Sequence, residues 1–149
     1  MIQFEGSRLI SLPITIVSAK LSDAEFLVKS LPDSEVSVAT PDRAAWKLRP
    51  KLSFLTGGLD AELTAISREA GKAVAFKIFS KAMGSSSSVI TRLIFRENEK
   101  GETIVDWTGV LTEVTGLLKV VPKGLLQGTA QKVIEDVWTA VTERMMKES

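Results

Sequence analysis

The sequence of 149 residues contains no cysteine, no histidine and no tyrosine. Without cysteine the chain can form no disulfide, no thiolate metal site and no thiol nucleophile. Without histidine it lacks the commonest general base and the commonest metal ligand, and without tyrosine it lacks a further proton donor. The remaining residues show neither metal-ligand spacing nor a glycine-rich phosphate loop. We therefore predict no metal, no cofactor and no catalytic residue.

An excess of one charge and long apolar runs are also missing. The formal net charge is +1, whereas a nucleic-acid-binding surface needs an excess of basic residues, so we expect no nucleic-acid partner. No apolar run approaches the ~20 residues of a membrane-spanning helix, and Glu5 and Arg8 interrupt the N-terminal segment where a signal peptide would lie. These features predict a cytoplasmic protein, and the length predicts a single domain over residues 1–149.

The segment from Pro122 to Met146 carries the longest helical pattern. At ~1.5 Å per residue it would be roughly 36 Å long. Its apolar residues recur at steps of three or four, which predicts one helix face with these members: Leu125, Leu126, Ala130, Val133, Ile134, Val137, Trp138, Val141 and Met145. A helix with so broad an apolar stripe needs a large apolar partner surface, and the strand patterns that precede it predict a sheet.

The preceding chain changes from one strand to helices and then to hairpins. Ile2, Phe4 and Gly6 alternate with polar residues, which is typical of a strand with one buried face. Residues 14–28 predict one or two short helices, and residues 36–115 predict about six strands separated by turns. Strands packed against helices on one side give an α+β domain. For the serine-rich stretch Met83–Ser88 two interpretations stay open: a flexible loop, or a strand start whose small side chains leave interior space.

Several short motifs follow one another in a characteristic order. They are Phe4–Ser7 in the first strand, Leu21–Asp23 before a short helix, Leu31–Asp33 after it, Gly101–Trp107 in the last hairpin, and Gly116 before the C-terminal helix. In this order the chain resembles the START-like, birch-pollen-allergen-like (SRPBCC) superfamily, and within it the CoxG group of carbon monoxide dehydrogenase subunits. The resemblance implies the helix-grip fold, in which a curved antiparallel sheet of about seven strands surrounds a long C-terminal helix and two short helices follow the first strand.

The resemblance also implies a function. Members of this superfamily bind lipids, sterols, polyketides or other hydrophobic molecules, and some catalyse cyclisation or hydrolysis. We therefore expect a lipid or quinone-like molecule to bind in a cavity between sheet and helix, in the service of a carbon monoxide dehydrogenase-type enzyme. Membrane-attached members tend to carry a C-terminal tail, whereas this sequence stops at Lys147–Ser149. We expect peripheral membrane contact rather than anchoring, and a dehydrogenase complex or a second copy as protein partners.

Two alternatives from other classes stay open. An accessory protein for assembly or membrane recruitment of a molybdenum dehydrogenase would expose an apolar patch. A polyketide-cyclase-like lyase or hydrolase would hold a carboxylate with a raised pKa inside the cavity. The strand carboxylates alternate with apolar neighbours, which predicts a solvated face for Asp60, Glu62, Asp106 and Glu113.

Strand and helix phases predict which residues would line the cavity. The expected lining is Val89, Thr91, Leu93, Phe95, Thr103, Val105, Trp107, Leu111, Leu126, Ala130, Val133, Val137, Trp138 and Val141, and the expected mouth is Phe54, Leu55, Gly57 and Gly58. Thr91 and Thr103 are the polar groups that would orient a ligand. A solid core is the alternative, because an empty cavity of ~300 Å³ would cost on the order of 7 kcal/mol, as much as the total stability of many domains.

Overall fold

The computed structural model describes residues 2–32, 34–48, 58–82 and 84–148, with seven strands, three α-helices and one 3₁₀ turn in this part of the chain. In chain order the elements are β1 (Ile2–Ile10), α1 (Ile14–Leu21), α2 (Ala24–Lys29), β2 (Glu35–Ala39), β3 (Arg43–Leu48), β4 (Leu59–Glu69), β5 (Ala73–Ala82), β6 (Ser85–Glu97), β7 (Thr103–Gly116), η1 (Leu117–Val120) and α3 (Lys123–Lys147).

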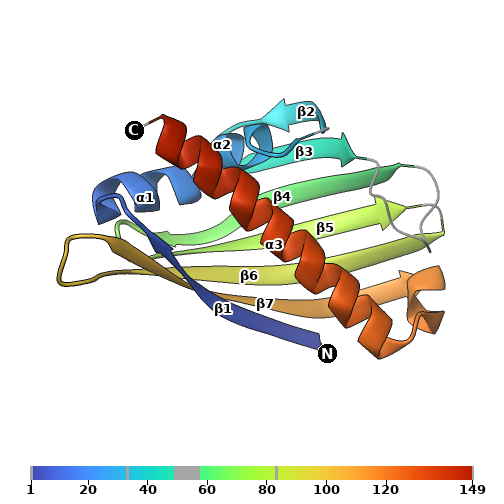
Figure 1. Ribbon diagram of the computed structural model, residues 1–149. Helices are drawn as coiled ribbons and strands as arrows, with labels where there is room; N and C mark the ends of the chain where they lie inside the picture. Colours follow the sequence, from blue (N-terminus) through green and yellow to red (C-terminus); the bar gives the residue numbers. More distant parts are fainter. Residues whose placement is uncertain (1, 33, 49–57, 83, 149) are drawn as a thin grey trace.

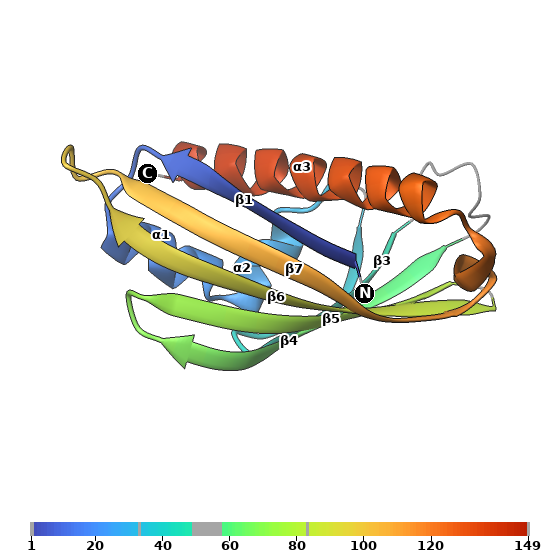
Figure 2. The same cartoon turned by 90° about the horizontal axis from the view of Figure 1, so that it is seen from below.

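All seven strands form one antiparallel sheet in the order β1-β7-β6-β5-β4-β3-β2. The first strand therefore pairs with the last one, and the hairpins in between follow chain order. The long helix α3 crosses one face of the sheet, and α1 and α2 lie at the end where α3 finishes (Figure 1). Viewed from below, α3 forms a layer of its own over the sheet (Figure 2). This is the α+β fold with a long C-terminal helix that the sequence predicts.

The strand register gives the sheet two chemically different faces. Phe4 pairs with Gly109, Gly109 with Thr91, and Thr91 with Phe76, so these four residues share the face that we call the inner face. Because side chains alternate along a strand, Trp107 and Val105 also belong to the inner face, whereas Asp106 and Thr108 belong to the opposite, outer face. The buried apolar cluster contains the inner-face residues Phe4, Phe76, Leu93, Val105 and Trp107 together with Trp138 and Val141 of α3, so the core lies between the sheet and α3.

One half of the inner face is completely covered. We call it the closed end and define it by Ile10, Val74, Phe76, Leu93, Phe95, Thr103, Val105 and Trp107 of the sheet and Trp138, Val141 and Met145 of α3, all of them buried. Helices α1 and α2 contribute Val17, Leu21, Ala24, Phe26 and Val28 to the same core. The covering helices begin where local chemistry favours it: α1 follows Pro13, and the side chain of Asp23 accepts a hydrogen bond from the backbone N–H of Glu25 at 3.0 Å to cap α2.

Polar contacts fasten α3 to the closed end. The guanidinium of Arg144 donates to the backbone carbonyl of Phe26 at 3.0 Å and lies 4.7 Å from the centre of the Phe26 ring. Lys20 of α1 forms an ion pair of 2.7 Å with Glu148, directly after α3. The last turns of α3 are thus joined to both short helices.

The structure decides between the two interpretations of the serine stretch that the sequence leaves open. The serine stretch does not form a flexible loop: β6 begins at Ser85, Ser85 and Ser88 are buried, and Ser86 shares a hydrogen bond of 2.5 Å with Thr115 of β7. The strand interpretation is therefore confirmed for Ser85–Ser88, whereas the interior space that it implies stays a prediction and Met83 lies outside the described residues. At the end of β7, Gly116 has a φ of 66°, and a methyl group there would lie 1.6 Å from the carbonyl oxygen of Gly84, so only glycine fits.

The apolar stripe of α3 is narrower than the sequence pattern suggests. Leu125, Val133 and Val137 are 49%, 44% and 38% exposed, whereas the row through Ala130, Ile134 and Trp138 faces the core. Successive helical residues are rotated by about 100°, so Val133 and Val137 project sideways when Ile134 and Trp138 point to the sheet. Val133 and Val137 therefore lie at the exposed edge of this stripe, and the prediction that they line a cavity stays a prediction.

Candidate functional site

The half of the inner face opposite the closed end is only partly covered. We call it the open end and define it by Ile2, Ile78, Val89, Thr91 and Leu111 of the sheet and Leu126, Ala130 and Ile134 of α3. Each of these residues keeps part of its surface exposed. Ile2, Ile78, Ala130 and Ile134 pack on the edge of the buried cluster. The open end is therefore an apolar surface on both the sheet and the helix that is not fully buried between them.

The two threonines predicted to orient a ligand already donate within the chain. The hydroxyl of Thr103 donates to the backbone carbonyl of Leu12 at 2.8 Å and is completely buried at the closed end. The hydroxyl of Thr91 donates to the backbone carbonyl of Thr108 at 2.8 Å, in the open end. Each oxygen keeps lone pairs that can accept a hydrogen bond, but only Thr91 lies where the inner face is partly exposed.

A pair of tryptophans separates the two ends. The ring centres of Trp107 and Trp138 lie 6.4 Å apart with a tilt of 38°. A methyl group at Gly6 would come within 2.9 Å of Nε1 of Trp107, so the polar edge of this indole lies against the backbone of β1. Trp107 is 6% exposed, and its Nε1 has no hydrogen-bond partner among the described residues. A buried N–H donor without an acceptor is uncommon and costs free energy.

Arg8 is a charged residue in contact with this pair. It pairs with Val105 and lies two residues from Gly6, so it belongs to the inner face of β1. Its guanidinium carbon lies 6.0 Å from the centre of the Trp138 ring, a cation–π distance. Arg8 is absent from the lining predicted from the sequence, although its phase with Ile2, Phe4 and Gly6 already pointed inward.

The predicted lining residues divide into three groups. Those at the closed end are Leu93, Phe95, Thr103, Val105, Trp107, Trp138 and Val141, and those at the open end are Val89, Thr91, Leu111, Leu126 and Ala130. Val133 and Val137 lie on the exposed flank of α3. Of the predicted mouth, Phe54, Leu55 and Gly57 lie outside the described residues, and Gly58 is exposed directly before β4. The sheet–helix cavity itself stays a prediction.

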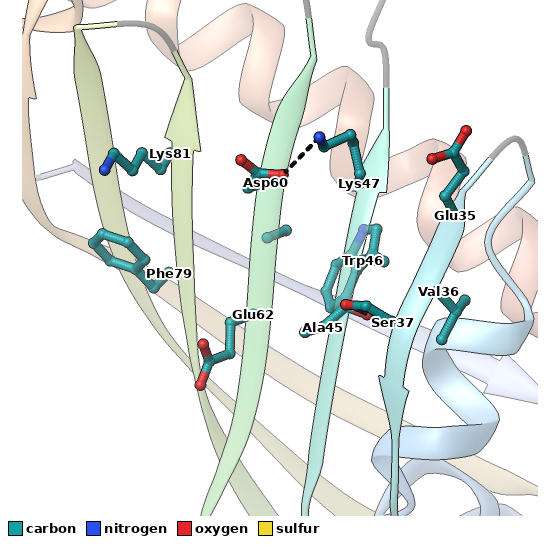
Figure 3. A pocket seen from close by; sticks show the side chains of 11 residues that line it. Glu35, Val36, Ser37, Ala45, Trp46, Lys47, Asp60, Glu62, Phe79 and Lys81 are labelled. Atoms are coloured by element: carbon teal, nitrogen blue, oxygen red, sulfur yellow. Dashed lines mark hydrogen bonds and ion pairs between the residues drawn. The ribbon is translucent and has the colours of Figure 1, made fainter.

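A separate depression of about 560 Å³ lies over β2 to β5. Most of its lining side chains belong to the outer face, and Figure 3 shows Asp60 and Lys47 joined by an ion pair, at 3.8 Å. The lining is Glu35, Val36, Ser37, Ala45, Trp46, Lys47, Asp60, Ala61, Glu62, Phe79 and Lys81. Nearby, Arg43 and Glu62 form an ion pair of 2.8 Å, which lowers the pKa of Glu62. No sequence pattern predicts this depression, since it depends on how four strands are placed. Its mixed charges make it a poor site for an apolar molecule.

The ionisable groups give no support to acid–base catalysis. Hydrogen bonds from Arg96 and Ser7 lower the pKa of Asp106, and a hydrogen bond from Lys20 lowers the pKa of Glu148. Asp106 lies on the outer face, as the sequence predicts. Within the described ranges no carboxylate is buried and no group of acidic side chains could hold a metal ion. The carboxylate expected for a lyase is thus not found in this part of the chain.

Comparison with known proteins identifies the relatives of the chain. Residues 6–146 match the model of the CoxG family, which is described as a subunit of carbon monoxide dehydrogenase. A search of curated proteins gives no match. In the described part of the chain, no helix has the length and apolar character needed to cross a membrane.

Solved structures share the fold at low sequence identity. A conserved protein from Geobacillus kaustophilus superimposes with a TM-score of 0.84 at 16% identity, over 98% of this chain and 96% of the other. A START superfamily protein from Mycobacterium smegmatis gives a TM-score of 0.71 at 10% identity, over 99% of both chains. A protein from Thermus thermophilus gives 0.67 at 17% identity, also over 99% of both. These similarities establish a START-like fold.

Proposed function

Because this chain belongs to the CoxG family of carbon monoxide dehydrogenase subunits, we propose that it binds an apolar small molecule, a lipid or a quinone-like compound, at the open end. Family and fold together assign the chain a ligand-binding or accessory role rather than a catalytic one. The proposal depends mainly on one observation: the open end has partly exposed apolar residues both on the inner face of the sheet and on α3, which lies over that face (Figure 2).

Energetics favour a bound apolar molecule at this place. Apolar surface that stays in contact with water forgoes about 25 cal/mol per Å² of stabilisation. Val89 and Leu111 on the sheet and Leu126 on the helix are partly exposed, so each lacks part of the stabilisation that full burial would give. A ligand that covers both walls would recover it without any change in the strand register, so binding and stability should rise together.

Filling the open end from the helix tests this proposal. Ala130 lies in the core-facing row of α3 and is partly exposed, so Ala130→Trp places an indole between the two walls. We expect it to weaken binding of the neutral fluorescent probe N-phenyl-1-naphthylamine by about tenfold or more. Val137→Trp is the matched control, because Val137 is exposed on the flank of the same helix, and it should change the affinity by less than about twofold.

Three outcomes would contradict the proposal: no probe binding by the wild type, equal binding by both variants, or a loss in Val137→Trp alone. Circular dichroism would establish that each variant keeps its fold. Native mass spectrometry of the purified protein, followed by organic extraction, would then identify any cargo. A released lipid or quinone would name the ligand class.

A second candidate function is an accessory role for a molybdenum dehydrogenase. It is favoured by the exposed apolar stripe Leu125, Val133 and Val137 on the flank of α3, since such a stripe suits a protein interface. In gel filtration with the purified dehydrogenase, the wild type should co-elute and Val133→Asp should not. Leu9→Asp, an exposed site on β1, is the control. Free elution of the wild type would contradict this role. A cytoplasmic location, peripheral membrane contact and a homodimer stay predictions.

A further inference from the structure

Arg8 is a cation on a face that is otherwise built from apolar and small side chains. The other inner-face residues of β1 are Ile2, Phe4, Gly6 and Ile10. Arg8 is partly buried, and its guanidinium contacts the ring of Trp138 at 6.0 Å. Within the described ranges it forms no hydrogen bond and no ion pair. A guanidinium in this position has lost part of its hydration and has gained no anion in return.

Most other arginines of the described part have an acidic partner. Arg43 pairs with Glu62, Arg68 with Asp42, Arg96 with Asp106 and Arg144 with Glu148. Arg92 has none, but it is exposed on the outer face, where water solvates it. Arg8 therefore differs from the others in combining partial burial with the lack of a carboxylate.

A second unused donor lies beside Arg8. The buried Nε1–H of Trp107 lies against the backbone of Gly6, two residues from Arg8 on the same face of β1. Trp138 contacts both groups, at 6.4 Å from the ring of Trp107 and 6.0 Å from the guanidinium of Arg8. One cation and one N–H donor thus lie at the boundary between the two ends, where Arg8 is one inner-face position closer to the closed end than Gly6, and neither has an acceptor among the described residues.

We infer that this corner, formed by Arg8, Trp107 and Trp138, binds the carboxylate head of an amphipathic ligand whose apolar part lies in the open end. The inference rests on the proposed function and adds the class of ligand: a long-chain carboxylate rather than a neutral apolar molecule. A carboxylate matches the planar fork of a guanidinium with two parallel hydrogen bonds, and its oxygens can also accept from an indole N–H. A neutral ester would leave the positive charge without a partner.

Quenching of tryptophan fluorescence by 9,10-dibromostearate and by its methyl ester tests this inference. The two probes share the same apolar chain and differ at the head, which is a charged carboxylate in the acid and a neutral methyl ester in the other. The wild type should bind the acid about tenfold or more tightly than the ester, because the acid adds a charge-assisted hydrogen bond. Arg8→Met, which keeps the length of the side chain, should reduce this ratio to about threefold or less. Trp107→Phe should reduce it by a smaller factor.

The matched control is Arg92→Met, which removes the same charge from the outer face of β6 and should leave the ratio unchanged. A wild-type ratio near one would overturn the carboxylate inference while tight ester binding would still support the proposed function. An Arg8→Met ratio equal to that of the wild type would also overturn it. If neither probe binds, the inference fails, and binding of N-phenyl-1-naphthylamine decides the proposed function separately. The wild-type ratio needs no variant, so the test stays decisive if Arg8→Met does not fold.

Discussion

The closed and open ends of the inner face consist of the same kinds of strands but are covered differently. At the closed end Phe76 is 1% exposed and Val105 is 0% exposed, and both belong to one buried cluster with residues of α1, α2 and α3. At the open end Val89 and Leu111 occupy equivalent inward positions on β6 and β7 and keep part of their surface exposed. Alternation along a strand thus decides which face a residue occupies, and the covering helices decide whether that residue is buried.

The polar contacts of α3 follow the same division. Arg144 donates to the carbonyl of Phe26 and stacks on its ring, and Glu148 pairs with Lys20. Both contacts are at the closed end. At the other end, α3 is joined to the sheet through η1 and the glycine at position 116. The closed end therefore supplies the stability of the domain, which leaves the open end available for binding a ligand.

The largest expected effect comes from removing a ring at the closed end. Phe76→Ala should lower the free energy of unfolding by about 3–5 kcal/mol, because the buried ring leaves a cavity that α1, α2 and α3 cannot fill. Ile78→Ala, two residues along the same strand at the open end, should cost about 1–2 kcal/mol, because part of the side chain is already exposed. Urea denaturation of both variants measures the difference. Equal losses would contradict the division into two ends.

A smaller effect is expected where the two ends meet. Gly6→Ala places a methyl group 2.8 Å from the ring of Trp107, so the indole has to move, at a cost of about 1–3 kcal/mol. Gly109→Ala is the control on the neighbouring strand, since its methyl group would meet Val89 at 3.8 Å, an ordinary contact. We expect it to change stability by about 0.5 kcal/mol or less. Thermal unfolding and the emission maximum of tryptophan measure both.

An unchanged emission maximum and unchanged stability in Gly6→Ala would mean that the Trp107 ring is not held against β1. A loss in Gly109→Ala as large as that in Gly6→Ala would mean that the open end is as tightly packed as the boundary. Either result would mean that the tightly packed part of the inner face does not end at Trp107.

The strands and the long helix could be predicted because each has a regular apolar period. Ile2, Phe4 and Gly6 of β1 and Val105 and Trp107 of β7 follow the period of two, and the structure places them all on the inner face. The serines at the start of β6 carry no apolar signal, so their strand conformation depends on pairing with β5 and β7. That pairing is tertiary, and a local pattern cannot reveal it.

The site was predicted less completely than the fold. Periodicity places Val89 and Val105 on one face but does not tell that Val105 is buried and Val89 is not. The rotation of α3 about its own axis depends on packing at Trp138 and Val141. Spacing alone therefore does not tell that Val133 and Val137 lie on the exposed flank of the helix. Arg8 has the phase of an inward residue, but its charge suggests the surface, and only the structure shows it against Trp138.

The smallest expected effect is electrostatic and lies on the outer face. Asp106 of β7 accepts hydrogen bonds from Arg96 of β6, at 2.6 Å, and from Ser7 of β1, so it links three strands. The hydrogen bond from Arg96 is the main cause that lowers the pKa of Asp106, with Ser7 second. A carboxyl whose pKa is lower in the folded than in the unfolded state stabilises the fold above its unfolded pKa and loses this effect as the pH falls through its folded pKa.

Asp106→Asn should therefore lower the melting temperature slightly at pH 7, and the difference from the wild type should disappear as the pH falls through the acidic range. The effect is small because water screens both partners of this exposed pair. Glu113→Gln, on the same strand near the open end, removes a carboxylate that has no ion pair in the described part of the chain. It should not reproduce this pH dependence. A constant difference between Asp106→Asn and the wild type from pH 7 down to strongly acidic pH would show that the charge of Asp106 does not stabilise the sheet, and that the amide only disturbs the packing of β1 against β7.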